Sequence, residues 1–261
     1  MLTQRVRQDV LEMIFNAKAS HIGSAFSIAD IVSVLYADVM KYDKTNYKRE
    51  DRDVFILSKG HAGSAVYAVL YELGILTKDE INSYCKNGSN LSGHVSSKGV
   101  EGVEFSTGSL GHGISVACGM AFARKRDAKK GNVYVLVGDG ECNEGSVWEA
   151  AMFANQHGLD NFCVIVDCNK MQAMGNSKDI IDLTEIAKIW SAFGWNTVEI
   201  NGHDCEQIYK ALTMPHKGKP LCVIANTIKG KGVSFMEGNI LWHYRNPDGE
   251  AYNIAKKELT D

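Results

Sequence analysis

The chain has 261 residues, of which 45% are hydrophobic and 23% are charged, and its formal net charge is −3. This length suits one sizeable globular core, and the mildly acidic charge argues against nucleic acid or an anionic membrane as a partner. No apolar run reaches the length expected of a membrane span, and the sequence after Met1 lacks a signal-peptide pattern. We therefore expect a single domain over residues 1–261.

Apolar periodicity predicts helices that alternate with short buried strands. In chain order, the first half predicts a helix at residues 2–17, a helix at 28–39, a strand at 54–57, a helix at 62–73, a capping box at 77–80 and a helix at 110–129. The second half predicts a strand at 132–137, a helix at 144–157, a strand at 162–166, a helix at 182–191, a strand at 197–200, a helix from 204 and a strand at 221–225. This alternation predicts an α/β fold, a doubly wound parallel sheet flanked by helices.

The seven cysteines are scattered along the chain without a CxxC spacing. Their odd number argues against a disulfide framework, and most of them lie in apolar stretches. We interpret them as free thiols in a reducing, cytoplasmic environment, and we expect no zinc site.

Two polar residues follow two of the predicted strands. Asp139 stands in Gly138-Asp139-Gly140 after one strand, and Asn169 follows the next strand. Because the carboxyl ends of parallel strands meet at one edge of a sheet, both side chains should converge where such folds bind ligands. Their oxygens suit Mg²⁺ or Ca²⁺, and Gly140 lets main-chain N–H groups approach an anion. A lone Gly-Asp-Gly can also be a simple turn at a strand end.

Histidines and glycines occur together in several predicted loops. Five of the eight histidines lie beside or close to glycine, namely His21, His61, His94, His112 and His203. Histidine titrates near neutrality, so it suits proton transfer to hydroxyl and carbonyl oxygens. The alternative for each one is a hydrogen-bonded or exposed loop histidine without a chemical role.

The order of these motifs resembles one enzyme family. Residues 138–175 are similar to the thiamine diphosphate motif, GDG followed about thirty residues later by Asn, in its transketolase form. Further segments that resemble transketolases are 16–24 (NAKASHIGS), 57–62 (LSKGHA), 92–94 (SGH), 106–113 (STGSLGHG), 227–232 (TIKGKG) and 242–243 (WH). Two residues depart from the family pattern, Ile22 in place of proline and His112 in place of glutamine, and they affect the sugar pocket rather than the cofactor site.

The resemblance implies thiamine diphosphate as the cofactor and Mg²⁺ as its metal, for which Ca²⁺ or Mn²⁺ can substitute. The implied metal ligands are Asp139, Asn169 and the main-chain carbonyl of Met171. The implied cofactor contacts are Ser24, His61, Gly108, Ser109, Leu110, Gly140 and Lys229. The implied catalytic residues are His21, His94 and His243, which would handle the sugar, and Glu144 and Glu149, which would link active sites across a subunit interface. Taken alone, the two glutamates and Lys229 also fit solvent-exposed positions of a helix and a turn.

The resemblance covers only the first domain of a full-length transketolase. It implies a thiamine-diphosphate-binding fold of the diphosphate-binding (PP) type, with the pyrimidine-binding domain on a separate chain. The chain would then be the N-terminal subunit of a split transketolase, inactive alone and joined to a C-terminal subunit in an α₂β₂ enzyme. The implied reaction transfers a two-carbon ketol unit from a ketose phosphate to an aldose, as in pentose phosphate metabolism.

Three other functions remain open at this point. An α subunit of a 2-oxo acid dehydrogenase or decarboxylase shares the cofactor motif, although the histidine loops argue against it. A non-catalytic subunit could keep the cofactor fold, but Asp139 and Asn169 are both present. A Rossmann nucleotide-binding protein is disfavoured because no GxGxxG follows the first strand.

Overall fold

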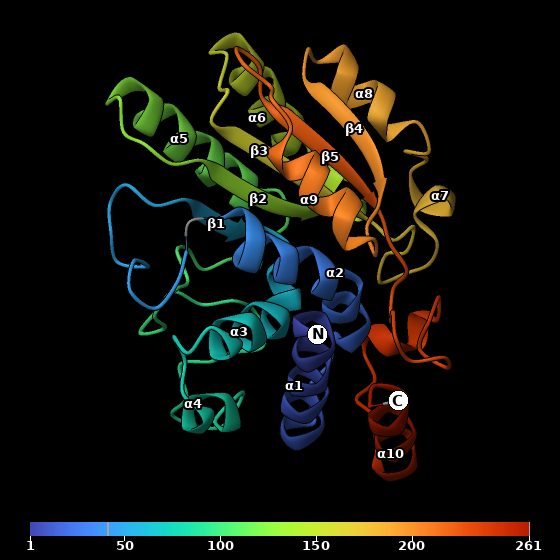
Figure 1. Ribbon diagram of the computed structural model, residues 1–261. Coiled ribbons are helices and arrows are strands. Elements are labelled where there is room, and N and C mark those ends of the chain that lie inside the picture. The colour runs from blue at the N-terminus through green and yellow to red at the C-terminus, as the bar shows by residue number, and fades with distance from the viewer. Residues whose placement is uncertain (41, 261) are drawn as a thin grey trace.

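The computed structural model describes residues 1–40 and 42–260 of the chain. At its centre is a five-stranded sheet, parallel throughout, in the order β1-β2-β3-β5-β4 (Figure 1). The strands are β1 (Val54–Leu57), β2 (Val133–Gly138), β3 (Phe162–Cys168), β4 (Asn196–Asn201) and β5 (Leu221–Asn226). The predicted α/β fold with a parallel sheet is confirmed, and each predicted strand is found.

Helices cover both faces of the sheet (Figure 1). One face packs against α1 (Leu2–Ala17), α2 (Ile22–Val34), α3 (Gly63–Glu72) and α9 (Cys205–Thr213), and the other against α5 (His112–Arg126), α6 (Gly145–Gln156) and α8 (Ile186–Ala192). Shorter or peripheral helices are η1 (Leu35–Val39), η2 (Gly60–Ala62), α4 (Lys78–Asn82), η3 (Gly140–Asn143), α7 (Ser177–Ile180), η4 (Ile240–His243) and α10 (Gly249–Glu258).

The strands divide the interior into two apolar cores. In β2, Val133, Val135 and Val137 face the core beneath α5 and α6, whereas Tyr134 and Leu136 face the core beneath α2 and α3. Successive side chains of a strand point to opposite faces, so a sheet covered on both faces needs apolar residues at every position. This requirement explains why the strands are continuous apolar runs in the sequence.

Two predicted helices begin elsewhere than expected. Helix α2 starts at Ile22 rather than at residue 28, directly after His21, whose φ of 73° lies in the left-handed region. Helix α8 starts at Ile186 rather than at residue 182, because the Asp182 carboxylate accepts the main-chain N–H of Thr184 and forms a turn. The predicted capping box is confirmed in α4.

The stretch Ile22–Val39 is long and apolar enough to cross a membrane by length and composition, contrary to the expectation that no run reaches this length. However, 83% of this stretch is buried inside the protein, because α2 packs against α1, α3 and α9. Its central place in one of the two cores accounts for its apolar composition.

Candidate active site

The carboxyl ends of four strands open into one cavity of about 500 Å³. It is lined by residues that follow these strands: Lys59 after β1, Asp139 after β2, Asn169 after β3 and Lys229 after β5. This edge is where open α/β sheets bind ligands. The lining contains most of the predicted site residues, namely His21, Ser24, His61, His94, Gly108, Leu110, Asp139, Gly140, Glu144, Asn169, Met171, Lys229 and His243.

Two predicted site residues, Ser109 and Glu149, do not line this cavity. Both are exposed, and Ser109 stands between Gly108 and Leu110, which do line it. Glu149 lies on α6 five residues after Glu144, which turns its side chain about 140° around the helix axis from that of Glu144. The structure therefore separates the two glutamates that the sequence analysis paired.

Asp139 is buried at the cavity edge and fixed by its neighbours. One carboxylate oxygen accepts the Gly140 N–H at 2.8 Å, and the other accepts the Lys170 N–H at 2.8 Å and the Ser177 hydroxyl at 3.0 Å. Burial raises the pKa of Asp139, and the nearby Asp167 carboxylate raises it further, despite these hydrogen bonds. A cation at this carboxylate would offset both effects.

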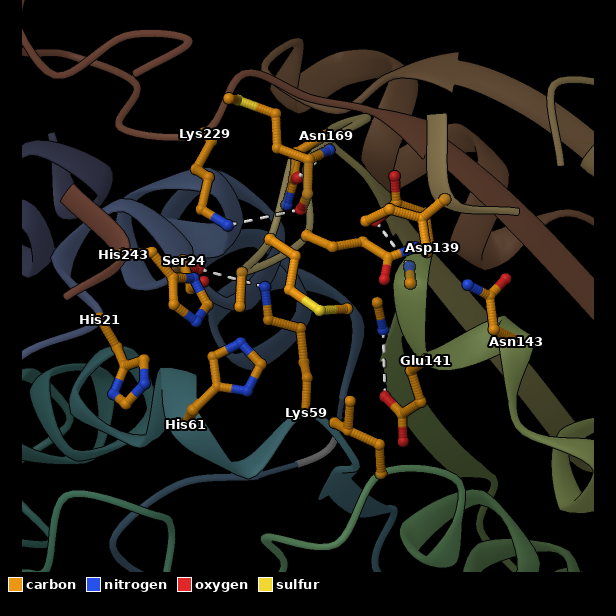
Figure 2. A pocket seen from close by; sticks show the side chains of 18 of the residues that line it. His21, Ser24, Lys59, His61, Asp139, Glu141, Asn143, Asn169, Lys229 and His243 are labelled. Carbon is orange, nitrogen blue, oxygen red and sulfur yellow. Dashed lines mark hydrogen bonds between the residues drawn. The ribbon is translucent and has the colours of Figure 1, made fainter. Parts of the chain in front are cut away.

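Asn169 and Met171 supply two uncharged oxygens beside Asp139 (Figure 2). The Asn169 amide donates to Asp167 at 2.9 Å, and its oxygen accepts the Met171 N–H at 3.0 Å. Within residues 1–40 and 42–260, no three His, Cys, Asp or Glu side chains form a metal-binding group. The predicted oxygen set, one carboxylate and two amide-type carbonyls, is the chemistry that Mg²⁺ prefers, but it needs further ligands from water or a bound phosphate.

Two lysines bring positive charge to the cavity. Lys229 is 2% exposed, and its Nζ donates to the Met171 carbonyl at 3.4 Å, yet no ion pair involves it among the described residues. Burial lowers the pKa of Lys229 to about 8, and the charge of Lys59 lowers it further. A buried ammonium without a counter-ion is unfavourable, so this side of the cavity favours an anionic ligand.

The other lysine, Lys59, is paired, and the sequence analysis did not include it in the site. Its Nζ lies 2.5 Å from an oxygen of the fully buried Asp167. Asp167 also accepts hydrogen bonds from Ser27, Thr227 and Asn169. The position of Lys59 directly after a strand was a signal for it, whereas Asp167 lies within an apolar strand, and its partners are distant in the sequence.

Four histidines form a cluster at the mouth of the cavity (Figure 2). The His21 ring centroid lies 5.0 Å from that of His243, 5.2 Å from that of His61 and 5.6 Å from that of His94. Burial lowers the pKa of His21 to about 4 and that of His243 to about 3, and nearby lysines lower both further. The pKa of His61 is also lowered, first by burial. At neutral pH these three rings are uncharged and can donate or accept a proton.

Three buried polar atoms that line the cavity have no hydrogen-bond partner: Asn143 Oδ1, Gln172 Nε2 and His243 Nδ1. Gln172 packs over the turn at Gly140, where an added Cβ would lie 2.7 Å from the Gln172 Cγ. Buried polar groups are normally satisfied, so these atoms indicate a polar ligand. The cavity thus fits a diphosphate with its metal in charge and in hydrogen-bonding capacity. The sequence analysis identified neither Asn143 nor Gln172.

Glu141 ties together three loops around the cavity and was also not identified. Its buried carboxylate accepts the Ser58 hydroxyl, the Gly111 N–H at 2.8 Å and the Gly138 N–H at 3.1 Å. Burial raises the pKa of Glu141, and these hydrogen bonds act against that rise. Its position directly after Gly138-Asp139-Gly140 was the only sequence signal for it.

A family model described as transketolase, thiamine diphosphate binding domain, matches residues 1–257. The chain is 40% identical to one of the named subunits of the apulose-4-phosphate transketolase of Phocaeicola vulgatus, over 99% of this chain and 92% of that protein. It is 38% identical to 6-deoxy-6-sulfo-D-fructose transketolase subunit SqwG of a Clostridium species, over 97% of this chain and 93% of that protein.

Solved structures show the same similarity. A transketolase from Leishmania mexicana matches with a TM-score of 0.94 at 30% identity, over 99% of this chain and 41% of that one. A transketolase from Campylobacter jejuni matches with a TM-score of 0.91 at 31% identity, over 99% of this chain and 43% of that one. The chain thus spans less than half of these two solved transketolases.

Proposed function

Because this chain belongs to the transketolase family, as its thiamine diphosphate binding domain, we propose that it is the diphosphate-binding subunit of a split transketolase. Relatives that are named as single subunits of transketolases align over nearly their whole length with this chain, and they support a two-chain enzyme. In this proposal the chain transfers no ketol unit alone, because a separate chain supplies the pyrimidine-binding domain. The transketolase relatives also favour this function over a 2-oxo acid dehydrogenase subunit.

The single observation that supports cofactor binding best is the buried Lys229 ammonium, which has no ion pair among the described residues and lines the cavity. The diphosphate of thiamine diphosphate would be its counter-ion, with Mg²⁺ held by Asp139, Asn169 and the Met171 carbonyl. The other cofactor contacts in this proposal come from the lining residues Ser24, His61, Gly108, Leu110 and Gly140.

Thiamine diphosphate, when bound, supplies the carbon nucleophile for the ketose carbonyl and holds the electrons of the two-carbon unit. The residues of this chain would orient the sugar and move its protons. His21 and His243 are uncharged at neutral pH, so each can accept a proton from a sugar hydroxyl or donate one to a carbonyl oxygen. His94 is exposed at the rim, where it would contact the part of the sugar nearer to solvent.

We propose a ketose phosphate as the donor and an aldose as the acceptor. The names of two relatives specify apulose 4-phosphate and 6-deoxy-6-sulfo-D-fructose, which are both anionic sugars. The cavity residues of this chain do not by themselves distinguish among such sugars, because half of the proposed pocket belongs to the partner chain.

We propose an α₂β₂ assembly, in which two copies of this chain meet through α5 and α6. Met152 and Phe153 on α6 are 53% and 41% exposed, and Glu149 lies on the same helix. Exposed large apolar side chains beside the cavity suit an interface between subunits. The predicted role of Glu144 and Glu149 in linking two active sites belongs to this assembly.

The seven cysteines are all free in the structure. Free thiols persist in reducing compartments, so we propose a cytoplasmic location for the enzyme.

Co-purification with the partner chain tests the proposed function. The tagged chain is purified from its host with thiamine diphosphate and Mg²⁺, and bound proteins are identified by mass spectrometry. We expect a stoichiometric partner and a complex that transfers ketol units from a ketose phosphate, whereas the chain alone is inactive. Full ketol transfer by the isolated chain, or a complex that turns over pyruvate but no sugar phosphate, would contradict the proposal.

A further inference from the structure

The segment that carries Lys229 is held from behind by charged residues outside the cavity. We call residues 227–232 the Lys229 loop. His203 lies outside the cavity lining, and its Nε2 is 2.8 Å from the Ile228 main-chain nitrogen. Its Nδ1 is 2.7 Å from a carboxylate oxygen of Asp30, on α2. His203 therefore connects the Lys229 loop to a helix whose first turn lines the cavity.

These contacts fix the protonation of the His203 ring. A main-chain N–H can only donate, so Nε2 must accept from Ile228 and carries no proton. The single ring proton is then on Nδ1, which donates to Asp30. His203 acts here as an uncharged connector that has one donor and one acceptor, on opposite sides of its ring.

Arg7 completes the connection from the other side. Its guanidinium forms a two-pronged ion pair with Asp30, at 2.8 Å and 2.6 Å, and its Nε donates to the Lys231 carbonyl at 2.9 Å. Burial by itself raises the pKa of Asp30, but the hydrogen bonds from Arg7 and His203 outweigh it and hold this pKa below its ordinary value. Asp30 thus anchors two contacts that hold the loop on either side of Lys229.

The remaining contacts of the loop direct the Lys229 side chain into the cavity. The Gly230 N–H donates to the Gly23 carbonyl at 2.9 Å, and the Lys229 carbonyl accepts the Gly238 N–H at 2.9 Å. A Cβ added to Gly23 would lie 3.1 Å from the Lys229 Cγ, so the first turn of α2 packs directly against the lysine stem. Small shifts of the loop therefore move the ammonium within the cavity.

We propose that His203 is a positioning residue that fixes Ile228 through Nε2 and thereby holds Lys229 in place for an anionic cofactor. This inference rests on the proposed function, because it takes Lys229 as a diphosphate ligand. It gives a role to the Gly202-His203 motif, which the cavity does not include. Holding the ammonium before the ligand arrives lowers the ordering cost of binding.

Two substitutions separate the contacts of the ring. The amide of Gln in His203→Gln can place an oxygen near the Nε2 position and accept from Ile228, whereas the shorter amide in His203→Asn reaches only the Nδ1 position and Asp30. The matched control is His216→Asn, which changes a partly exposed histidine that contacts only the Lys219 carbonyl.

Amide hydrogen exchange of the Lys229 loop is measured in the cofactor-free full chain. The affinity for thiamine diphosphate with Mg²⁺ is measured by calorimetry on the complex with the partner chain. In His203→Asn we expect exchange in residues 227–232 and the cofactor Kd each to rise about ten-fold, the effect of one lost main-chain hydrogen bond. His203→Gln and His216→Asn should stay within about two-fold of wild type in both measurements.

Unchanged loop exchange and Kd in His203→Asn would overturn the inference, as would equal losses in the Gln and Asn variants. A rise in exchange spread evenly over the sheet would also overturn it, because that marks a merely structural role. If the wild-type complex binds no thiamine diphosphate, the proposed function fails, and loop exchange alone still decides whether His203 holds the loop.

Discussion

Lys59 and Asp167 form a buried ion pair beneath the cavity, with Nζ 2.5 Å from the nearer carboxylate oxygen. Lys59 follows β1 and Asp167 lies near the end of β3, so the pair connects two strands that are separated by β2. Asp139 follows β2 directly, between these two anchored strand ends. The pair therefore fixes the spacing of the strand ends around the proposed metal site.

Breaking this pair should destabilise the fold strongly. Lys59→Met leaves the Asp167 carboxylate buried without its counter-ion, which typically costs about 3–5 kcal/mol of unfolding free energy. Urea unfolding of the cofactor-free chain measures this cost. Lys210→Met, which removes an exposed pair with Glu206, is the control and should leave the midpoint unchanged. Equal midpoints for the two variants would show that the buried pair is dispensable.

A single methyl group at Gly60 should displace a cavity wall. An added Cβ would lie 2.3 Å from the Thr107 carbonyl oxygen, which is backbone and cannot rotate away. We expect Gly60→Ala to cost about 1–3 kcal/mol in urea unfolding and to weaken cofactor binding, because Thr107 precedes the lining residues Gly108 and Leu110. Gly249→Ala has open space around its Cβ and serves as the control. Wild-type stability in Gly60→Ala would mean that this loop shifts freely.

The sequence predicted the sheet because each strand is buried on both faces and therefore reads as a continuous apolar run. It predicted Asp139, Asn169 and Lys229 because each belongs to a motif directly after such a strand. These parts of the fold and the site depend on local patterns, and local patterns can be recognised in a single sequence.

The residues that the sequence did not reveal depend on contacts between distant segments. Asp167 is polar within an apolar strand, and only the folded chain brings Lys59 to it. The orphan amide of Gln172 has meaning only above the Gly140 turn. Conversely, Glu149 was grouped with Glu144 although the helix phase turns the two apart.

Removing the Asp139 charge should separate folding from cofactor binding. Burial raises the pKa of this carboxyl, so its ionised form is costly before a cation binds. Asp139→Asn should therefore unfold at the same Tm as wild type, or slightly higher, without ligands. Thiamine diphosphate with Mg²⁺ should raise the Tm of wild type and of the control Asp179→Asn but leave that of Asp139→Asn unchanged. A ligand-induced rise in Asp139→Asn equal to that of wild type would remove Asp139 from the metal site.

Replacing His243 should impair the reaction more than cofactor binding. Its ring lies 5.0 Å from that of His21, and its Nδ1 is buried without a partner, ready for a substrate oxygen. In the assembled enzyme, His243→Ala should lower kcat by about 10²–10⁴-fold with little change in the cofactor Kd. The exposed His157 provides the control as His157→Ala. An unchanged kcat would show that His243 transfers no proton in the rate-limiting step.

The buried histidines should make folding sensitive to acid. His21 and His243 have pKa values of about 4 and about 3 in the folded chain, against 6.5 for an ordinary histidine. As pH falls below 6.5 the unfolded chain therefore binds protons that the folded chain does not, and stability falls until these lower values are reached. Above pH 6.5 the two histidines contribute no pH dependence.

Comparison of variants isolates this contribution. The pKa of Asp9 is raised to about 6, chiefly by burial, so the folded chain binds its proton first and Asp9 opposes the histidines in the same pH range. The test is therefore the loss of urea midpoint between pH 7.5 and pH 5 in wild type against that in His243→Gln. We expect a smaller loss in His243→Gln and the full loss in the partly exposed control His216→Gln, since only His243 belongs to the buried cluster. Equal losses in all three proteins would mean that His243 takes up its proton in the folded chain as readily as in the unfolded chain.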